Sequence, residues 1–117
     1  MKKGDFALEE RIQSQCFVWH WNTYPQERGL LHANNNNSEN AIKGNKNKAM
    51  GVVAGVADME YCKNGNTYFI EFKRPGQIQS PKQVVFEELV KAEGFCYELI
   101  TSFDEFVSLI KKIRNES

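Results

Sequence analysis

The fold is decided by residues 52–73, VVAGVADMEYCKNGNTYFIEFK, where two apolar runs flank an Asn-Gly pair. Asn64-Gly65 between β-branched and aromatic residues is the strongest short-range hairpin signal, because a type I′ turn needs positive φ at both central positions. We therefore predict a β-hairpin with strands over 52–61 and 67–73.

One face of this hairpin carries charged side chains. Because side chains alternate along a strand, Glu71 and Lys73 share a face, and a turn at 64–65 places Asp58 directly opposite Glu71. Two opposed carboxylates repel each other, so a hard cation such as Mg²⁺ or Mn²⁺, which prefers oxygen ligands, would stabilise the pair. Lys73 would then orient a water molecule or stabilise the charge on a phosphate. This geometry is typical of a phosphodiesterase.

The same residues have a plainer interpretation, as charges on a strand that faces solvent. Glu-x-Lys alone is a weak signal. A register slip of one residue would also move Asp58 to the other face, which would separate it from Glu71. Both interpretations stay open on the residues alone.

Helices and one further strand are predicted around the hairpin. A helical apolar spacing covers residues 6–21, and Ser80-Pro81-Lys82-Gln83 has the N-cap, first-turn proline and capping-box pattern of a helix start. We expect the buried stripe of that second helix to be Val85, Leu89 and Ala92. A strand over 95–100 would run parallel to the second hairpin strand, because a helical crossover joins them.

A final amphipathic helix follows Ser102, with an apolar face at Phe106, Leu109, Ile110 and Ile113. The element order is therefore α, long loop, β, β, α, β, α. The predicted class is α/β, with a small mixed sheet flanked by helices.

Composition limits the remaining possibilities. The chain has 117 residues, which is room for a single domain over 1–117, and its 15 basic and 15 acidic residues give no net charge. Any nucleic acid must therefore be recognised by a local group of charged side chains, because the chain as a whole exerts no attraction on a polyanion. Three widely spaced cysteines offer neither a disulfide framework nor a zinc knuckle. No apolar run reaches the ~18 residues of a membrane span, so we expect a cytoplasmic protein without membrane contact.

Residues 34–48, NNNNSENAIKGNKNK, are rich in asparagine and lysine and contain almost nothing that a core could use. We expect a flexible loop, since connections of ~15 residues are usually functional or disordered. Lys43, Lys46 and Lys48 would either contact phosphates or simply be solvated.

Three segments, 55–58 (GVAD), 69–74 (FIEFKR) and 80–83 (SPKQ), together resemble the VRR-NUC domain of the PD-(D/E)XK nuclease superfamily. The spacing of Glu9, Gln13 and Trp19 in the first helix strengthens the resemblance, which spans nearly the whole chain. It implies a stand-alone, virus-type member with a restriction-endonuclease-like core. One departure is Ala57, where family members commonly have proline.

The resemblance also implies a role for individual residues. The implied catalytic residues are Asp58, Glu71, Lys73, Glu9 and Gln83, and the implied metal ligands are Asp58, Glu71 and the carbonyl of Phe72. Glu10 is the alternative to Glu9, and the capping box explains Gln83 equally well without catalysis. Lys43, Lys46, Lys48, Arg74 and Lys82 are the candidates for phosphate contacts.

The resemblance implies a Mg²⁺- or Mn²⁺-dependent endonuclease that cleaves DNA, selective for branched structures as Holliday-junction resolvases are, in replication, recombination or repair. A homodimer is expected, because a C₂ assembly suits a four-way junction of similar symmetry. A monomeric mass at micromolar concentration would contradict it. The alternative is a nucleic-acid-binding module on a nuclease fold without turnover.

Overall fold

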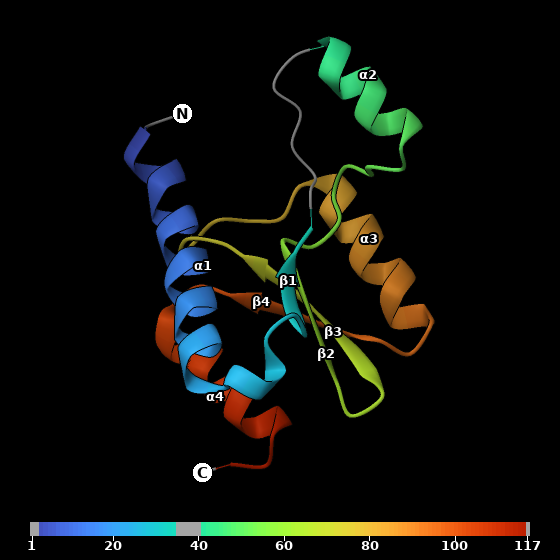
Figure 1. The fold of residues 1–117 in the computed structure, drawn as a ribbon. Coiled ribbons are helices and arrows are strands. Elements are labelled where there is room, and N and C mark those ends of the chain that lie inside the picture. Colours follow the sequence, from blue (N-terminus) through green and yellow to red (C-terminus); the bar gives the residue numbers. More distant parts are fainter. Residues whose placement is uncertain (1–2, 35–40, 117) are drawn as a thin grey trace.

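The computed structural model describes residues 3–34 and 41–116, which form a four-stranded mixed sheet with helices on both faces (Figure 1). The elements in chain order are α1 (Lys3–Thr23), the short 3₁₀ helix η1 (Pro25–Glu27), β1 (Leu31–Ala33), α2 (Ala41–Ala49), β2 (Met59–Lys63), β3 (Asn66–Phe72), α3 (Pro81–Ala92), β4 (Cys96–Ile100) and α4 (Phe103–Ile113). The strand order is β1-β2-β3-β4. Neighbouring strands are antiparallel except for β3 and β4, which are parallel. The predicted class, hairpin and parallel strand are confirmed.

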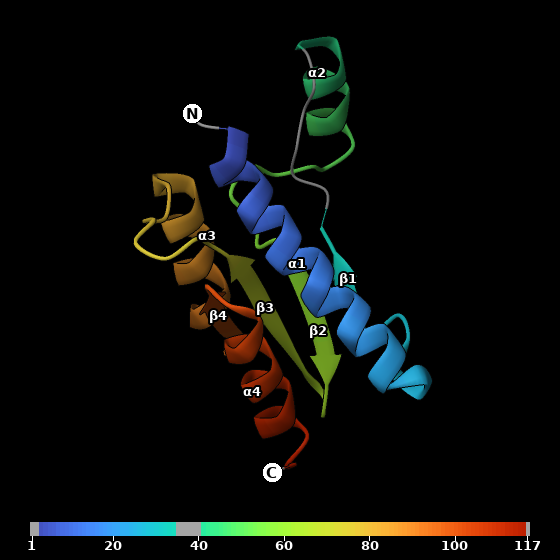
Figure 2. The same cartoon turned by 90° about the vertical axis from the view of Figure 1, so that its left-hand side faces the viewer.

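The sheet separates two layers of helices. Helices α1 and α4 cover one face, and α3 packs on the other (Figures 1 and 2). The α1 and α4 side holds the main core, where Ile70 and Phe72 of β3 pack with Ile12 and Cys16 of α1. Phe106 of α4 belongs to the same core, as its periodicity predicts.

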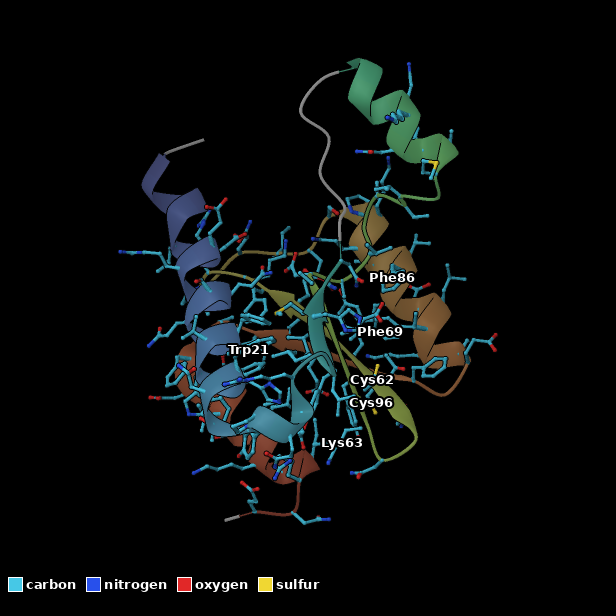
Figure 3. The ribbon with its side chains drawn as sticks, in the orientation of Figure 1. Trp21, Cys62, Lys63, Phe69, Phe86 and Cys96 are labelled. Atoms are coloured by element: carbon cyan, nitrogen blue, oxygen red, sulfur yellow. The ribbon has the colours of Figure 1, made fainter. Side chains whose placement is uncertain are left out.

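Helix α3 begins as predicted but presents a different face. Ser80 is its N-cap and forms a capping box with Gln83. The prediction of a buried stripe that contains Val85 and Leu89 is wrong, because these side chains are 55% and 62% exposed. Phe86 faces the sheet instead and packs edge-on against Phe69 of β3, with ring centroids 5.3 Å apart (Figure 3). The aromatic side chain buries more apolar area than valine, so its position sets the rotation of the helix.

The prediction of a loop over residues 34–48 is also corrected. Residues 41–49 form α2, and Asn34 continues from β1, while residues 35–40 lie outside the described part of the chain. The first hairpin strand is shorter than predicted, since β2 starts only at Met59. Gly51 and Gly55, with φ of 94° and 91°, hold the preceding segment out of the ladder.

No helix among the described residues is long and apolar enough to cross a bilayer. All three cysteines are free thiols.

Candidate active site

Asp58 is held at the end of the hairpin as the predicted register requires. Met59 pairs with Ile70, which sets Asp58 beside the end of β3, and the Asp58 Oδ2 atom accepts a hydrogen bond from the Phe72 N–H at 2.7 Å. Asn34 fixes the same segment, because its backbone N–H donates to the Asp58 carbonyl at 2.9 Å and its side chain donates to the Ala57 carbonyl at 3.0 Å.

The electrostatic environment of Asp58 disfavours its negative charge. Burial, together with the charges of Glu71 and Glu9, raises the pKa of Asp58 to about 6. The Phe72 N–H and the Lys73 ammonium act in the opposite direction and do not cancel the rise. A cation placed beside Asp58 would relieve this cost.

Glu71 is fully buried, and only one of its two carboxylate oxygens has hydrogen-bond partners. Its Oε1 atom accepts hydrogen bonds from the Tyr97 hydroxyl and from the Gln79 amide, the latter at 3.2 Å. Its Oε2 atom has no hydrogen-bond partner. The Lys73 ammonium lies 3.5 Å from Oε2, close enough for an ion pair, and Lys73 is itself buried. Buried acceptors are normally bonded, so an open carboxylate oxygen marks a position where a ligand is expected.

Gln79 and Tyr97 are the residues of this site that sequence reasoning missed. Gln79 also donates to Glu87 at 3.0 Å, and burial together with the bond to Glu71 raises the pKa of the Tyr97 hydroxyl. Alternation in the strand over 95–100 could have placed Tyr97 on the same side of the sheet as Phe69, its pairing partner in β3. Nothing in the local sequence points to Gln79, which lies in the segment before α3.

A cavity of about 340 Å³ opens above the carboxylates, between the first half of α1, the segment before β2 and the start of α3. Its wall includes Glu9, Asp58, Phe72, Lys82 and Gln83, so the structure brings these predicted residues together. Glu71 and Lys73 do not line the cavity and are buried.

The sequence leaves two alternatives open, the choice between Glu9 and Glu10 and the role of Gln83. Glu9 and Glu10 both line the cavity, but Glu9 is the one whose charge acts on Asp58. Gln83 uses its Oε1 atom to accept the Ser80 N–H at 2.8 Å, so the capping role is present. Its place in the cavity wall leaves a second role available to the rest of the amide.

The predicted phosphate contacts divide into two groups. Lys82 is exposed in the cavity wall, and Arg74 directly follows Lys73. Lys46 and Lys48 are exposed on α2, which lies at the same end of the molecule as the start of α3 (Figures 1 and 2). The Lys43 side chain lies outside the described part of the structure.

The donor set suits a hard divalent cation. Asp58 supplies a carboxylate of raised pKa and Glu71 an unbonded carboxylate oxygen, and both lie beside the backbone of Phe72. The described residues contain no cluster of three or more His, Cys, Asp or Glu side chains placed to hold a metal. Zinc in a structural site needs such a cluster, whereas Mg²⁺ usually keeps several waters and takes one or two carboxylates.

Comparison with known proteins identifies the fold. No protein-family model and no curated protein sequence matches the chain. A solved structure described as a "VRR_NUC domain protein" superposes with a TM-score of 0.76 at 21% identity, covering 92% of this chain and 88% of that chain. The chain has the VRR-NUC fold. A second structure, described as "VRR_NUC domain", matches with a TM-score of 0.58 at 20% identity over 89% of this chain and 95% of the other.

Gly55 lets the Asp58 segment of this VRR-NUC fold touch helix α3. A Cβ atom on Gly55 would lie 2.6 Å from the backbone carbonyl carbon and oxygen of Lys82, and the φ of 91° is left-handed. We expect Gly55→Ala to lower the free energy of unfolding by about 2–3 kcal/mol in urea titrations, because strain and a backbone clash add.

The matched control is Gly94→Ala. Gly94 has the same φ of 91° but nothing within 4 Å of its Cβ position, so only the cost of the left-handed conformation, about 1–2 kcal/mol, is expected. Equal losses of unfolding free energy in the two variants would show that the backbone around Lys82 moves at no cost to make room for the added methyl group.

Proposed function

We propose that this chain is a Mg²⁺- or Mn²⁺-dependent endodeoxyribonuclease that hydrolyses phosphodiester bonds, with the selectivity for branched DNA that its sequence resemblance implies. The observation that carries the proposal is the pair of carboxylates at the cavity, with Asp58 in its wall and Glu71 buried next to Phe72. Asp58 has a raised pKa, Glu71 leaves one oxygen unbonded, and Lys73 lies 3.5 Å from that oxygen. The VRR-NUC fold supports the same assignment.

Each residue of the site has a distinct part in the proposed chemistry. The ligands would be Asp58, Glu71 and the carbonyl of Phe72, and a cation held there would supply Lewis-acid chemistry for phosphodiester hydrolysis. Lys73, held in place by its ion pair with Glu71, orients the attacking water and stabilises negative charge on the phosphate.

The surface beside the cavity would hold the DNA backbone. Glu9 and Gln83 line the cavity, where Glu9 would add negative charge near a bound cation and the Gln83 amide N–H groups would be free to donate to a phosphate. Lys82 and Arg74, with Lys46 and Lys48 on α2, would contact neighbouring phosphates. Affinity should then fall as salt rises, because such contacts release counterions.

The test is cleavage of labelled four-way junction, flap and duplex DNA with Mg²⁺, Mn²⁺ or EDTA. We expect cleavage with either cation and none with EDTA, because the carboxylates alone cannot act as a Lewis acid toward the phosphate. Lys73→Met should reduce the rate about 10²–10³-fold, the usual effect of removing one group that stabilises the transition state. Lys112→Met, at an exposed lysine on α4, is the matched control and should cleave like the wild type.

Cleavage that persists in EDTA would contradict the metal assignment. Binding of DNA without cleavage under any condition would favour the nucleic-acid-binding module instead. The homodimer stays a prediction, tested by the mass of the protein at micromolar concentration in the same buffers.

A further inference from the structure

A second hollow lies beside the candidate active site and has a different chemistry. It has a volume of about 590 Å³ and lies between α1 and β1. Its wall is mostly apolar, with Phe17 and Trp21 from α1 and Leu31, Ala33 and Met59 from the sheet. The site described above uses none of these side chains.

The two hollows are adjacent. Glu10 and Gln13 of α1 line both of them, so the two hollows meet along this part of the helix. At a rise of ~1.5 Å per residue, Glu9 and Trp21 are separated by about 18 Å along the helix. A short stretch of extended polynucleotide can span that distance.

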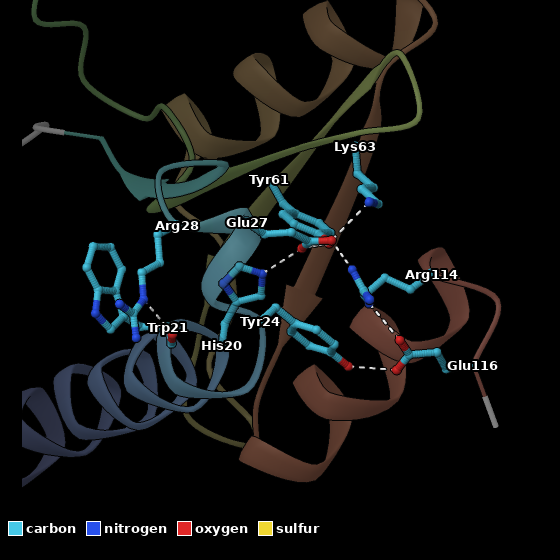
Figure 4. Close-up of polar contacts among 9 residues, drawn as sticks. All are labelled: His20, Trp21, Tyr24, Glu27, Arg28, Tyr61, Lys63, Arg114 and Glu116. Atoms are coloured by element: carbon cyan, nitrogen blue, oxygen red, sulfur yellow. Dashed lines mark hydrogen bonds and ion pairs between the residues drawn. The ribbon is translucent and has the colours of Figure 1, made fainter.

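The wall of the second hollow is suited to planar rings. Trp21 is 39% exposed although it is a large aromatic side chain (Figure 3). Its ring centroid lies 5.6 Å from that of Phe17, one helical turn earlier. Arg28 does not itself line the hollow, but it holds the indole in place: its guanidinium carbon lies 4.9 Å from the Trp21 ring centroid and its Nε donates to the Trp21 carbonyl at 3.0 Å (Figure 4). Aromatic rings with an arginine plane are the usual platform for unpaired bases.

We propose that this hollow binds an unpaired nucleobase of the strand whose backbone lies in the active-site cavity. The inference rests on the proposed function and names its substrate class, which is DNA with a single-stranded segment next to the scissile bond. A base inside an intact duplex is stacked and paired, and it could enter the hollow only after extrusion from the helix. A nucleic-acid occupant is favoured over an apolar peptide because the hollow shares Glu10 and Gln13 with the wall of the cavity that we assign to a phosphodiester.

The test is binding of a labelled oligothymidylate and of a duplex of equal length, measured by fluorescence anisotropy in EDTA so that no cleavage intervenes. We expect Trp21→Ala to weaken binding of the single strand about 5- to 100-fold, as the loss of one stacked base does. Binding of the duplex should be unchanged. Trp21→Phe, which keeps an aromatic face, should retain most of the affinity for the single strand.

The matched control is Val18→Ala, at an exposed apolar residue of α1 that does not line the hollow. It should bind both DNAs like the wild type, and circular dichroism should show every variant folded. An unchanged single-strand affinity in Trp21→Ala, or an equal loss on duplex, would overturn the inference. If the wild type still cleaves DNA with Mg²⁺ in that case, the proposed function stands and only the inference that the hollow binds a base is rejected. A wild type that neither binds nor cleaves any DNA would remove both.

Discussion

Asp58→Asn is expected to abolish metal-dependent cleavage and, at the same time, to stabilise the folded protein in the absence of divalent cations. Asparagine keeps the oxygen that accepts the Phe72 N–H, so the local geometry is preserved. It removes a charge that burial and Glu71 disfavour. A pKa raised from 3.8 to about 6 corresponds to a gain of at most about 3 kcal/mol in the free energy of unfolding at neutral pH.

The pH dependence gives the sign of this effect. Because the folded-state pKa is the higher one, the wild type holds this proton more tightly when folded, and it loses that stability as the pH rises through about 6. The gain in the Asn variant should therefore be full above about pH 6 and should vanish below about pH 4, where the carboxyl is protonated in both states. Urea titrations in EDTA across this range measure it.

Two controls separate the charge of Asp58 from general effects of the substitution. Asp104→Asn changes an exposed residue in the first turn of α4 and should cost about 0.3–1 kcal/mol, since it weakens the interaction with the helix dipole. Added Mg²⁺ should raise the melting temperature of the wild type and leave that of Asp58→Asn unchanged, because the substitution removes a carboxylate that we propose as a ligand of the cation. If Asp58→Asn were less stable than the wild type in EDTA at neutral pH, the charge of Asp58 would not be destabilising the folded protein.

Local signals account for most of what the sequence predicted. The Asn64-Gly65 turn fixes the hairpin register through the conformations it demands, and both residues have the positive φ that a type I′ turn requires. That register alone brings Asp58 beside the end of β3 and the site of Glu71. The N-caps at Ser80 and Ser102 are equally local, since each hydroxyl accepts the N–H three residues later.

Predictions failed where the outcome depends on distant parts of the chain. The bonds of Glu71 to Tyr97 span 26 residues and three elements, and no short-range pattern encodes them. The rotation of α3 depends on which side chain packs against Phe69 of β3. Phe86 takes that position, which leaves Val85 and Leu89 exposed. Helix α2 falls in a stretch whose composition favours a loop.

A second buried carboxylate, Glu27, belongs to the framework rather than to the candidate site. It is 3% exposed and is the acceptor at the centre of a polar network that joins η1, β2 and the end of α4 (Figure 4). Its partners are His20 at 3.0 Å, the Tyr61 hydroxyl at 2.6 Å, the Lys63 ammonium at 2.9 Å and the Arg114 guanidinium. Burial and Arg114 lower the pKa of His20, so His20 donates to Glu27 as a neutral ring at neutral pH.

Glu27→Ala is therefore expected to lower the free energy of unfolding by about 3–5 kcal/mol, because it leaves the half-buried Lys63 and Arg114 charges and the buried Tyr61 hydroxyl without their acceptor. The guanidinium of Arg114 lies against the Tyr24 ring at 3.8 Å, so it cannot turn out to water without losing that contact. Urea unfolding at neutral pH measures the loss, and the variant that remains folded should cleave DNA like the wild type, because Glu27 does not line the active-site cavity.

Glu116→Ala is the control for this prediction. Glu116 also pairs with Arg114, at 2.8 Å, and accepts the Tyr24 hydroxyl, but its side chain is 36% exposed. Water can replace it, so its removal should cost no more than about 1 kcal/mol. If both variants lost the same stability, the ends of α4 and η1 would be joined by surface contacts, and burial of the Glu27 charge would not be what holds them together.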